Sequence, residues 1–206
     1  MKKNLQENYW KNNFSYIQRN TQFSEKDGAK EWIKIIGNYQ SKINNILECG
    51  SNIGKNTRQI NYAYPKKKIS LIELNKEAYN IVIKNKFIEN SFNGSILDCD
   101  FKKNYFDLVF TSGVLIHINP KDLKENLKKI ISFSKKYVLI MEYYSKKPEM
   151  IKYRGKKNLL FKRDFGSYIL DNFKVKILET GFLWSRKNPK ARFDDLTYWL
   201  FEKKTK

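Results

Sequence analysis

The sequence predicts a doubly wound α/β domain: a mostly parallel seven-stranded sheet with helices on both faces. Two observations support this fold class. From residue 43 to 144, short runs rich in β-branched and aromatic residues alternate with segments of helical periodicity, which is typical of right-handed βαβ crossovers. Near the end, two β-rich runs, 175–183 and 197–202, are separated by a connection too long for a tight hairpin. They are expected to pair antiparallel at one edge of the sheet.

The remaining elements follow in chain order. Residues 1–40 are expected to form a helical N-terminal extension, because Ser24 can cap a helix whose apolar residues, Trp32 among them, share one face. Pro120 opens a later helix, since proline is favoured in the first helical turn, and residues 145–155 are basic and irregular. The other strands are expected at 43–49, 68–72, 92–96, 106–110 and 137–141, and the other helices at 56–63, 76–85 and 161–172.

The composition is that of a folded, water-soluble domain. Of the 206 residues, 41% are hydrophobic and 15% aromatic, which is enough apolar material for one core and excludes a wholly disordered chain. No apolar run approaches the ~18 residues that a membrane span needs, and the opening residues have no apolar stretch typical of a secretory signal. Two cysteines, Cys49 and Cys99, suit a reducing compartment, so a cytoplasmic location is expected.

The net charge of +20 raises the possibility of a nucleic-acid partner. However, 35 of the 41 basic residues are lysines, whereas arginine is the residue suited to bidentate phosphate and guanine recognition. Lysine, asparagine and isoleucine, all abundant here, are the residues that AT-rich codons specify. We therefore attribute the charge mainly to composition, and a nucleic-acid partner stays open as the alternative.

A ligand site is predicted where the first strand ends, because ligands of open α/β sheets bind beyond the carboxyl ends of the strands. Gly50 and Gly54 allow a sharp turn before the next helix, whose N-terminus favours an anionic group. The second strand then ends at Glu73, where a carboxylate can accept hydrogen bonds from both hydroxyls of a ribose. A glycine turn after the first strand, followed by a carboxylate at the end of the second, indicates a nucleoside site more specifically than the turn alone.

The residues around the turn indicate which nucleoside binds. A dinucleotide site requires a middle glycine, and this chain has Asn52 there. Glu48, just before the turn, would repel a pyrophosphate but can accept a hydrogen bond from an ammonium group; its alternative role is as a partner of a helix end or a lysine. A ligand with a ribose, an amine and one carboxylate, such as S-adenosylmethionine, is therefore favoured over a dinucleotide.

Three sequence runs resemble motifs of class I S-adenosylmethionine-dependent methyltransferases, which have a Rossmann-like fold. They are ILECGSNIG, LIELN and FDLVFTSGVLIHINP, corresponding to motifs I, post-I and IV. The flanks narrow the resemblance to the methylases associated with pseudaminic acid biosynthesis: Tyr9-Trp10 near the start, Tyr153-Arg-Gly155 and Asp194-Asp-Leu-Thr-Tyr-Trp199 in the tail. That family also has asparagine at the Asn52 position.

The resemblance implies one domain over 1–206, with an extension at 1–40, a cofactor-binding core at 41–144 and a substrate and edge-strand part at 145–206. It also implies a set of cofactor contacts along the chain. These are Glu48, the turn residues Gly50, Ser51, Asn52 and Gly54, the ribose acceptor Glu73, the adenine contacts Ser95 and Ile96, and Thr111 and Ser112 beside the methyl group. Arg19 is a candidate partner for the carboxylate of the cofactor or the substrate; the alternative is a surface arginine tied to a helix end.

His117, the single histidine, follows the fourth strand where a methyl acceptor would enter. A neutral imidazole there could take a proton from the acceptor; the alternative is a partly buried histidine bonded to backbone. With one histidine and two distant cysteines, no metal site is expected. Further acceptor contacts are expected from Trp10, Glu142, Tyr143, Arg154 and Arg163. Glu142 and Tyr143 could instead cover the edge of the sheet, and Arg154 and Arg163 could instead lie on a solvated helix face.

The functional hypothesis is methyl transfer from S-adenosylmethionine, with S-adenosylhomocysteine as product. The acceptor implied by the resemblance is a small polar molecule, a nonulosonic acid or nucleotide-linked sugar methylated at nitrogen or oxygen. Two alternatives remain: a nucleic-acid methyltransferase that uses the basic surface, and a non-catalytic cofactor-binding subunit of a partner enzyme.

Overall fold

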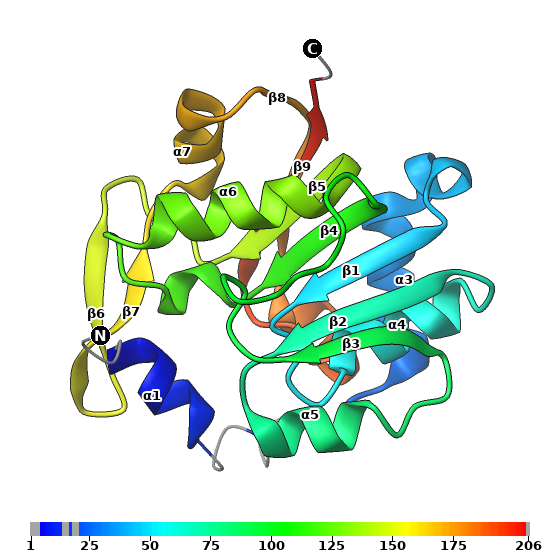
Figure 1. Ribbon diagram of the computed structural model, residues 1–206, viewed down its shortest axis with the longest axis horizontal. Coiled ribbons are helices and arrows are strands. Elements are labelled where there is room, and N and C mark those ends of the chain that lie inside the picture. The colour runs from blue at the N-terminus through cyan, green and yellow to red at the C-terminus, as the bar shows by residue number, and fades with distance from the viewer. Residues whose placement is uncertain (1–4, 14–16, 18–20, 205–206) are drawn as a thin grey trace.

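A seven-stranded sheet lies at the centre of the chain, with helices on both faces (Figure 1). The computed structural model describes residues 5–13, 17 and 21–204. The sheet order is β3-β2-β1-β4-β5-β9-β8. Its strands are β1 (Asn45–Cys49), β2 (Lys68–Glu73), β3 (Ile88–Asn93), β4 (Phe106–Ser112), β5 (Ser134–Glu142), β8 (Val175–Leu183) and β9 (Leu196–Lys203).

The strand directions confirm the predicted fold class. Strands β1 to β5 are parallel, while β9 is antiparallel to both β5 and β8. The chain order reverses between β1 and β4, so this end of the sheet has the switch point at which doubly wound folds bind ligands. One expectation was wrong: the third strand lies at 88–93 and not at 92–96, because Ile88 to Asn93 pair with β2 and the chain then turns at Gly94.

The helices form two layers. The α-helices are α1 (Leu5–Lys11), α3 (Glu25–Ile36), α4 (Lys55–Ala63), α5 (Lys76–Val82), α6 (Leu123–Phe133) and α7 (Phe165–Asn172). Short 3-10 turns are η1 (Gly37–Lys42), η2 (Leu115–His117), η3 (Ser185–Lys187) and η4 (Pro189–Ala191). Ser24 caps α3 as predicted, because its Oγ accepts a hydrogen bond of 3.1 Å from the Asp27 N–H.

Alternating residues of the central strands feed two hydrophobic cores. Leu47 and Val109 pack on the face that carries α6 and α7. Their neighbours Ile46 and Leu108 pack on the opposite face with Trp32 of α3. Burial on both faces explains why these strands read as continuous apolar runs and not as alternating ones.

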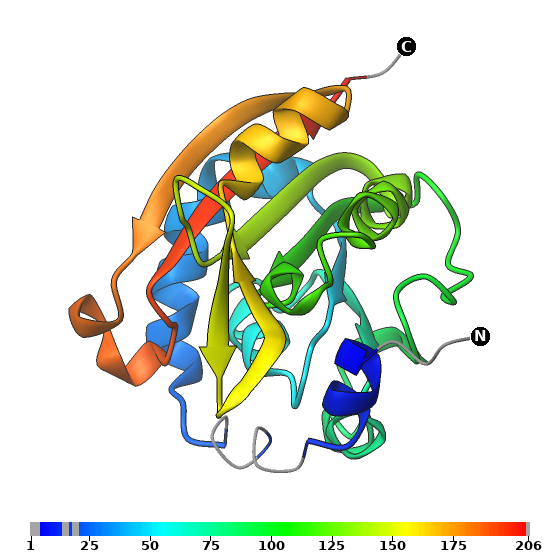
Figure 2. The ribbon, with the colours of Figure 1, turned by 90° about the vertical axis from the view of Figure 1, so that its left-hand side faces the viewer.

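A two-stranded hairpin replaces the irregular segment expected at 145–155. Strands β6 (Glu149–Tyr153) and β7 (Lys156–Lys162) pair antiparallel around Arg154 and Gly155 (Figure 2). Both turn residues have positive φ, +47° and +78°, as type I′ hairpin turns require. The pattern was missed because buried and exposed side chains do not alternate along either strand, so no period of two marks them.

The same segment corrects the helix expected at 161–172. Residues up to Lys162 belong to β7, and α7 begins at Phe165. Asp164 sets that start, because its carboxylate accepts a hydrogen bond of 2.9 Å from the Ser167 N–H.

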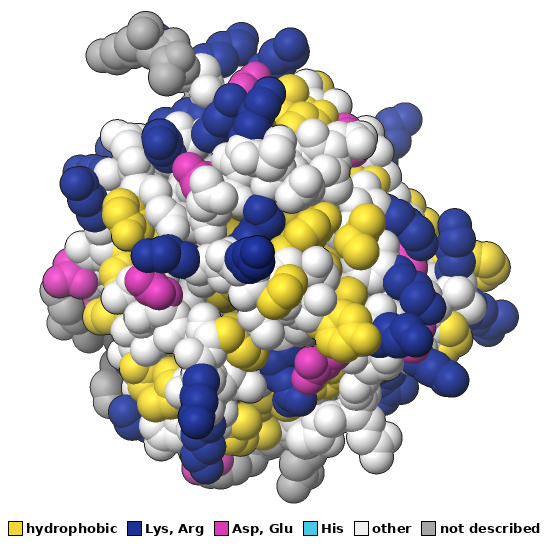
Figure 3. Space-filling view, turned by 90° about the vertical axis from the view of Figure 1, so that its right-hand side faces the viewer, with side chains coloured by type: hydrophobic (Ala, Val, Ile, Leu, Met, Phe, Trp, Pro, Cys, Tyr) yellow, Lys and Arg dark blue, Asp and Glu magenta, His cyan; other side chains and the backbone are white. Residues whose placement is uncertain are grey.

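The basic side chains are spread over the surface rather than concentrated in one band on the face shown in Figure 3, where acidic and hydrophobic side chains lie between them. This distribution agrees with a compositional origin of the charge. In the described part of the chain, no helix is both long and apolar enough to cross a membrane.

Candidate active site

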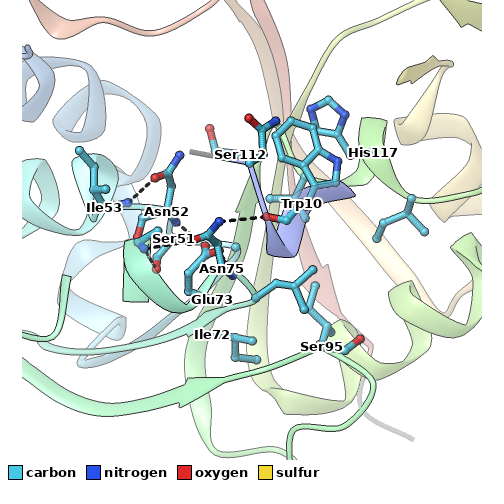
Figure 4. Close-up of a pocket in the computed structure, with 18 of the residues that line it drawn as sticks. Trp10, Ser51, Asn52, Ile53, Ile72, Glu73, Asn75, Ser95, Ser112 and His117 are labelled. Atoms are coloured by element: carbon cyan, nitrogen blue, oxygen red, sulfur yellow. Dashed lines mark hydrogen bonds between the residues drawn. The ribbon is translucent and has the colours of Figure 1, made fainter. Parts of the chain in front are cut away.

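A cavity of about 190 Å³ opens at the carboxyl ends of β1, β2 and β4, beside α1 (Figure 4). The switch point of the sheet therefore carries a pocket, as the sequence predicted. Most of the expected cofactor residues line this first cavity. They are Gly50, Ser51, Asn52, Glu73, Ser95, Ile96 and Ser112, joined by Trp10 and His117.

The glycine turn has the conformation that its residues suggest. Gly50 and Gly54 have φ values of +82° and +85°, and a Cβ on Gly50 would lie 2.5 Å from a methyl group of Val114. Asn52 is also left-handed, at φ +51°, and its Oδ1 accepts a hydrogen bond of 2.7 Å from the Ile53 N–H. Asparagine adopts this region more readily than most residues, so the turn forms without the middle glycine.

Glu73 ties the turn to the second strand. Its two oxygens accept hydrogen bonds from the Asn52 N–H, at 2.6 Å, and the Asn75 N–H, at 2.7 Å. Burial raises the pKa of this carboxyl, and the two backbone donors oppose that effect. Each carboxylate oxygen has more than one acceptor site, so Glu73 can hold the turn and still accept hydrogen bonds from a ligand in the cavity.

Helix α1, which belongs to the N-terminal extension, covers one side of the cavity. The Asn75 side chain donates to the backbone carbonyls of Trp10 and Lys11, both at 3.1 Å. The Ser95 hydroxyl donates to the Glu7 carboxylate at 2.7 Å. The predicted adenine-side residue is thus in contact with the extension.

His117 lies at the inner end of the same cavity, with its ring 4.2 Å from the Trp10 ring, centroid to centroid (Figure 4). Its Nδ1 is 2.7 Å from the carbonyl oxygen of Leu159. A carbonyl can only accept, so Nδ1 carries the proton and Nε2 has the free lone pair. Burial lowers the pKa of His117 to about 4, which keeps the imidazole neutral at physiological pH.

Glu142 lies behind the cavity, in contrast to its expected contact with an acceptor. It is fully buried and accepts hydrogen bonds of 3.0–3.3 Å from the N–H groups of Leu115, Val114 and Ile116 and from the Thr111 hydroxyl. Burial raises its pKa to about 7. Glu142 therefore fixes the η2 turn that carries the histidine, and Thr111 serves this carboxylate and does not line the cavity.

Glu48 also lies behind the cavity, although it was expected to contact the cofactor. Its side chain is fully buried and accepts a hydrogen bond of 2.8 Å from the Asn56 amide. Burial raises its pKa to about 8. Gly54 likewise is not part of the lining and serves as the N-cap of α4. Both residues shape the loop from behind.

A second cavity, of about 800 Å³, shares His117, Gly113 and Asp194 with the first. Tyr143 and Arg154 line it, as expected for acceptor contacts. Of the remaining two predicted positions, one does not join the site and the other is not described by the structure. Arg163 lines neither cavity and stacks over the Tyr168 ring at 4.6 Å, and Arg19 lies outside the described residues.

Several lining residues were missed from sequence. Lys55 directly follows the glycine turn; its ammonium donates to the Arg192 carbonyl at 2.7 Å, and burial lowers its pKa. Asn75 had a detectable signal, because it stands at the N-cap of α5 two residues after Glu73. Asp194 belongs to a tail run that carries the family resemblance, but its local sequence did not indicate that the fold brings it to both cavities from the far end of the chain.

Comparison with known proteins agrees with this geometry. Residues 46–136 match the family model described as a methyltransferase domain. No curated protein matches the sequence. Among solved structures, the chain resembles an S-adenosylmethionine-dependent methyltransferase of Leishmania major, with a TM-score of 0.73 and 14% identity, over 95% of this chain and 81% of that one.

Two further structures contain S-adenosylhomocysteine. One is magnesium protoporphyrin IX methyltransferase of Synechocystis PCC 6803, with a TM-score of 0.68 and 11% identity over 96% of this chain and 98% of that one. The other is 1,6-didemethyltoxoflavin-N1-methyltransferase of Burkholderia thailandensis, with a TM-score of 0.63 and 12% identity over 87% and 80%. At such identities the likeness establishes a common fold.

Proposed function

We propose that this chain, whose residues 46–136 match the family model of a methyltransferase domain, transfers a methyl group from S-adenosylmethionine to a small polar acceptor. One observation carries the proposal: the glycine turn and Glu73 line a cavity that shares His117 with a second cavity. A cofactor site and an acceptor site thus meet at a residue able to accept a proton.

The first cavity suits the cofactor in three places. Glu73 would accept hydrogen bonds from the ribose, and Ser95 and Ile96 would border the adenine. The ammonium of the half-buried Lys55, which lines the same cavity, can bind the methionyl carboxylate. This assignment gives Lys55 the task that the sequence had suggested for Arg19.

The chemistry needs little from the protein beyond placement. When bound, the sulfonium supplies an activated methyl group and leaves as a neutral thioether. The turn and Glu73 hold the donor, and α1 with Trp10 shields the cavity from water. His117 Nε2 can take the proton of an acceptor hydroxyl as its oxygen attacks the methyl group, or the proton that an acceptor ammonium must lose before its amine nitrogen attacks. Positioning of the two reactants supplies the main part of the rate enhancement.

For the acceptor we propose a nonulosonic acid or a nucleotide-linked sugar. The resemblance of the flanking segments supports this choice, and one of them, Tyr153-Arg-Gly155, contributes two lining residues to the second cavity. The two buried free cysteines, Cys49 and Cys99, are consistent with a cytoplasmic enzyme. A nucleic-acid acceptor is the alternative that the net charge of +20 favours.

Calorimetric titration with S-adenosylmethionine and S-adenosylhomocysteine, with NAD as the control, tests the proposal. We expect micromolar binding of both sulfur nucleosides and none of NAD. Radiolabelled methyl transfer to sugar acids, nucleotide sugars and RNA then identifies the acceptor class. Absence of binding to either sulfur nucleoside would refute the cofactor assignment, and binding without transfer to any acceptor would favour the non-catalytic subunit.

A further inference from the structure

The second cavity is lined by three arginines that come from two separate segments. Arg154 stands in the turn of the β6–β7 hairpin, while Arg186 lies in η3 and Arg192 directly follows η4, in the connection between β8 and β9. Among the described lining residues Asp194 is the one carboxylate. The described lining therefore carries three guanidinium groups and one carboxylate, a net positive charge.

We propose that this cavity binds an acceptor that carries a negatively charged group, a carboxylate or a phosphate, held by Arg154, Arg186 and Arg192. The inference rests on the proposed methyltransferase function and specifies its acceptor class. Guanidinium groups present paired N–H donors that match the oxygens of carboxylates and phosphates. An anion placed among three of them also relieves their mutual repulsion.

The backbone holds two of these arginines in place. Arg154 has φ +47° in the hairpin turn, and its guanidinium lies over the Tyr153 ring at 5.4 Å and 3.4 Å from the Asn13 side-chain oxygen. Arg192 has φ +58°, and its carbonyl accepts the Lys55 hydrogen bond. Since these contacts fix the backbone on both sides, a ligand does not have to order two mobile loops.

His117 connects the anion site to the reaction. It lines both cavities, so an acceptor held by the arginines places its reactive atom within the space bordered by the imidazole. The positive charge of Arg154 is one of the effects that lower the pKa of His117, after burial. An anion bound at Arg154 would offset that effect and make the imidazole a better base when the acceptor is present.

The acceptor must therefore contain two distinct groups, an anion and a separate hydroxyl or amine. A cavity of about 800 Å³ is much larger than an inorganic anion requires and has room for a sugar. Lysines are absent from its described lining, so the scattered surface charge does not contribute to this site. These features favour a small sugar anion over an RNA strand.

The test is calorimetric titration of the S-adenosylhomocysteine-loaded protein with three probes. N-acetylneuraminate offers a carboxylate, N-acetylglucosamine 1-phosphate offers a phosphate, and N-acetylmannosamine is neutral. We expect at least one anionic probe to bind and the neutral sugar not to. Arg154→Gln, Arg186→Gln and Arg192→Gln should each weaken that binding by at least about tenfold, and the preferred probe tells carboxylate from phosphate.

Arg163→Gln is the matched control, because it removes the same charge from a residue that lines neither cavity. It should leave the probe affinity unchanged. S-adenosylhomocysteine affinity, measured first on every variant, reports folding and separates this inference from the proposed function. An RNA oligonucleotide is titrated as a further comparison. If S-adenosylhomocysteine binds, any of three results overturns the inference: the neutral sugar binds as well as the anionic probes, no anionic probe binds, or the RNA alone binds. If the cofactor itself does not bind, the proposed function fails.

Discussion

Replacement of Glu73 by alanine should affect both stability and cofactor binding. The substitution leaves the N–H groups of Asn52 and Asn75 without their carboxylate acceptor. An unsatisfied buried donor costs about 1–3 kcal/mol, so two would cost about 2–6 kcal/mol. Because water can enter the space left in the cavity, we expect a value near the lower limit, about 2 kcal/mol. For a chain of this length that corresponds to a fall in Tm of roughly 4–8 °C.

The same variant should bind S-adenosylhomocysteine more than about tenfold more weakly, a loss beyond ~1.4 kcal/mol, because the ribose loses its acceptor. Thermal unfolding and calorimetric titration measure the two effects separately. Glu89→Ala on the neighbouring strand is the control: its carboxylate forms a surface ion pair with Lys68 at 3.3 Å, worth less than about 1 kcal/mol. A folded Glu73→Ala protein with wild-type cofactor affinity would show that Glu73 only supports the turn.

Two further predictions concern the histidine and the turn. Burial lowers the pKa of His117 to about 4, so the imidazole is neutral above that pH. On the acidic side of the pH profile, kcat/KM should therefore be constant above about pH 5 and fall below it. An inflection near pH 6.5 would show that His117 is not buried as described. Such a weak base gives a modest rate effect, so His117→Gln should lower kcat by about 10²-fold, measured under cofactor saturation. Gly50→Ala should destabilise the protein by about 2–5 kcal/mol, because left-handed strain adds to a clash with Val114 at 2.5 Å. Gly113→Ala, also left-handed but with nothing within 4 Å of its Cβ, should cost only about 1–2 kcal/mol in the same urea unfolding experiment, and equal losses for the two variants would disprove the clash.

The fold could be predicted from sequence because its central strands are buried on both faces and its helices have one apolar face each. The β6–β7 hairpin could not, since buried and exposed side chains do not alternate along its strands, which are also rich in lysine. Its turn signal, Arg154-Gly155, is weaker than the Asn-Gly or Asp-Gly pairs that mark type I′ turns most clearly. Local patterns thus identify elements with a regular apolar face and miss an element that adds only a few residues, such as Leu160, to the core.

The site was predicted unevenly for a similar reason. Glu73 and the turn residues lie at strand ends that the order of elements brings together, so their meeting follows from topology. For Glu142, sequence position gave the correct end of the sheet but not the direction of the side chain, which points to three backbone N–H groups. Arg186, Arg192 and Asp194 reach the second cavity through a connection whose path depends on tertiary packing, and no short-range pattern encodes it.

Helix α1 links the surroundings of the two cavities. It is bonded to the side of the first cavity through Asn75 and Ser95, and to the hairpin that borders the second cavity through Gln6, whose amide donates to the Asn158 carbonyl at 2.8 Å. Its Trp10 ring also packs against His117 and Tyr153, which line the second cavity. A ligand in the first cavity would therefore meet α1 directly, and a ligand in the second would meet the residues on which α1 packs. Any effect of one ligand on the affinity for the other through this helix must be reciprocal and equal in size.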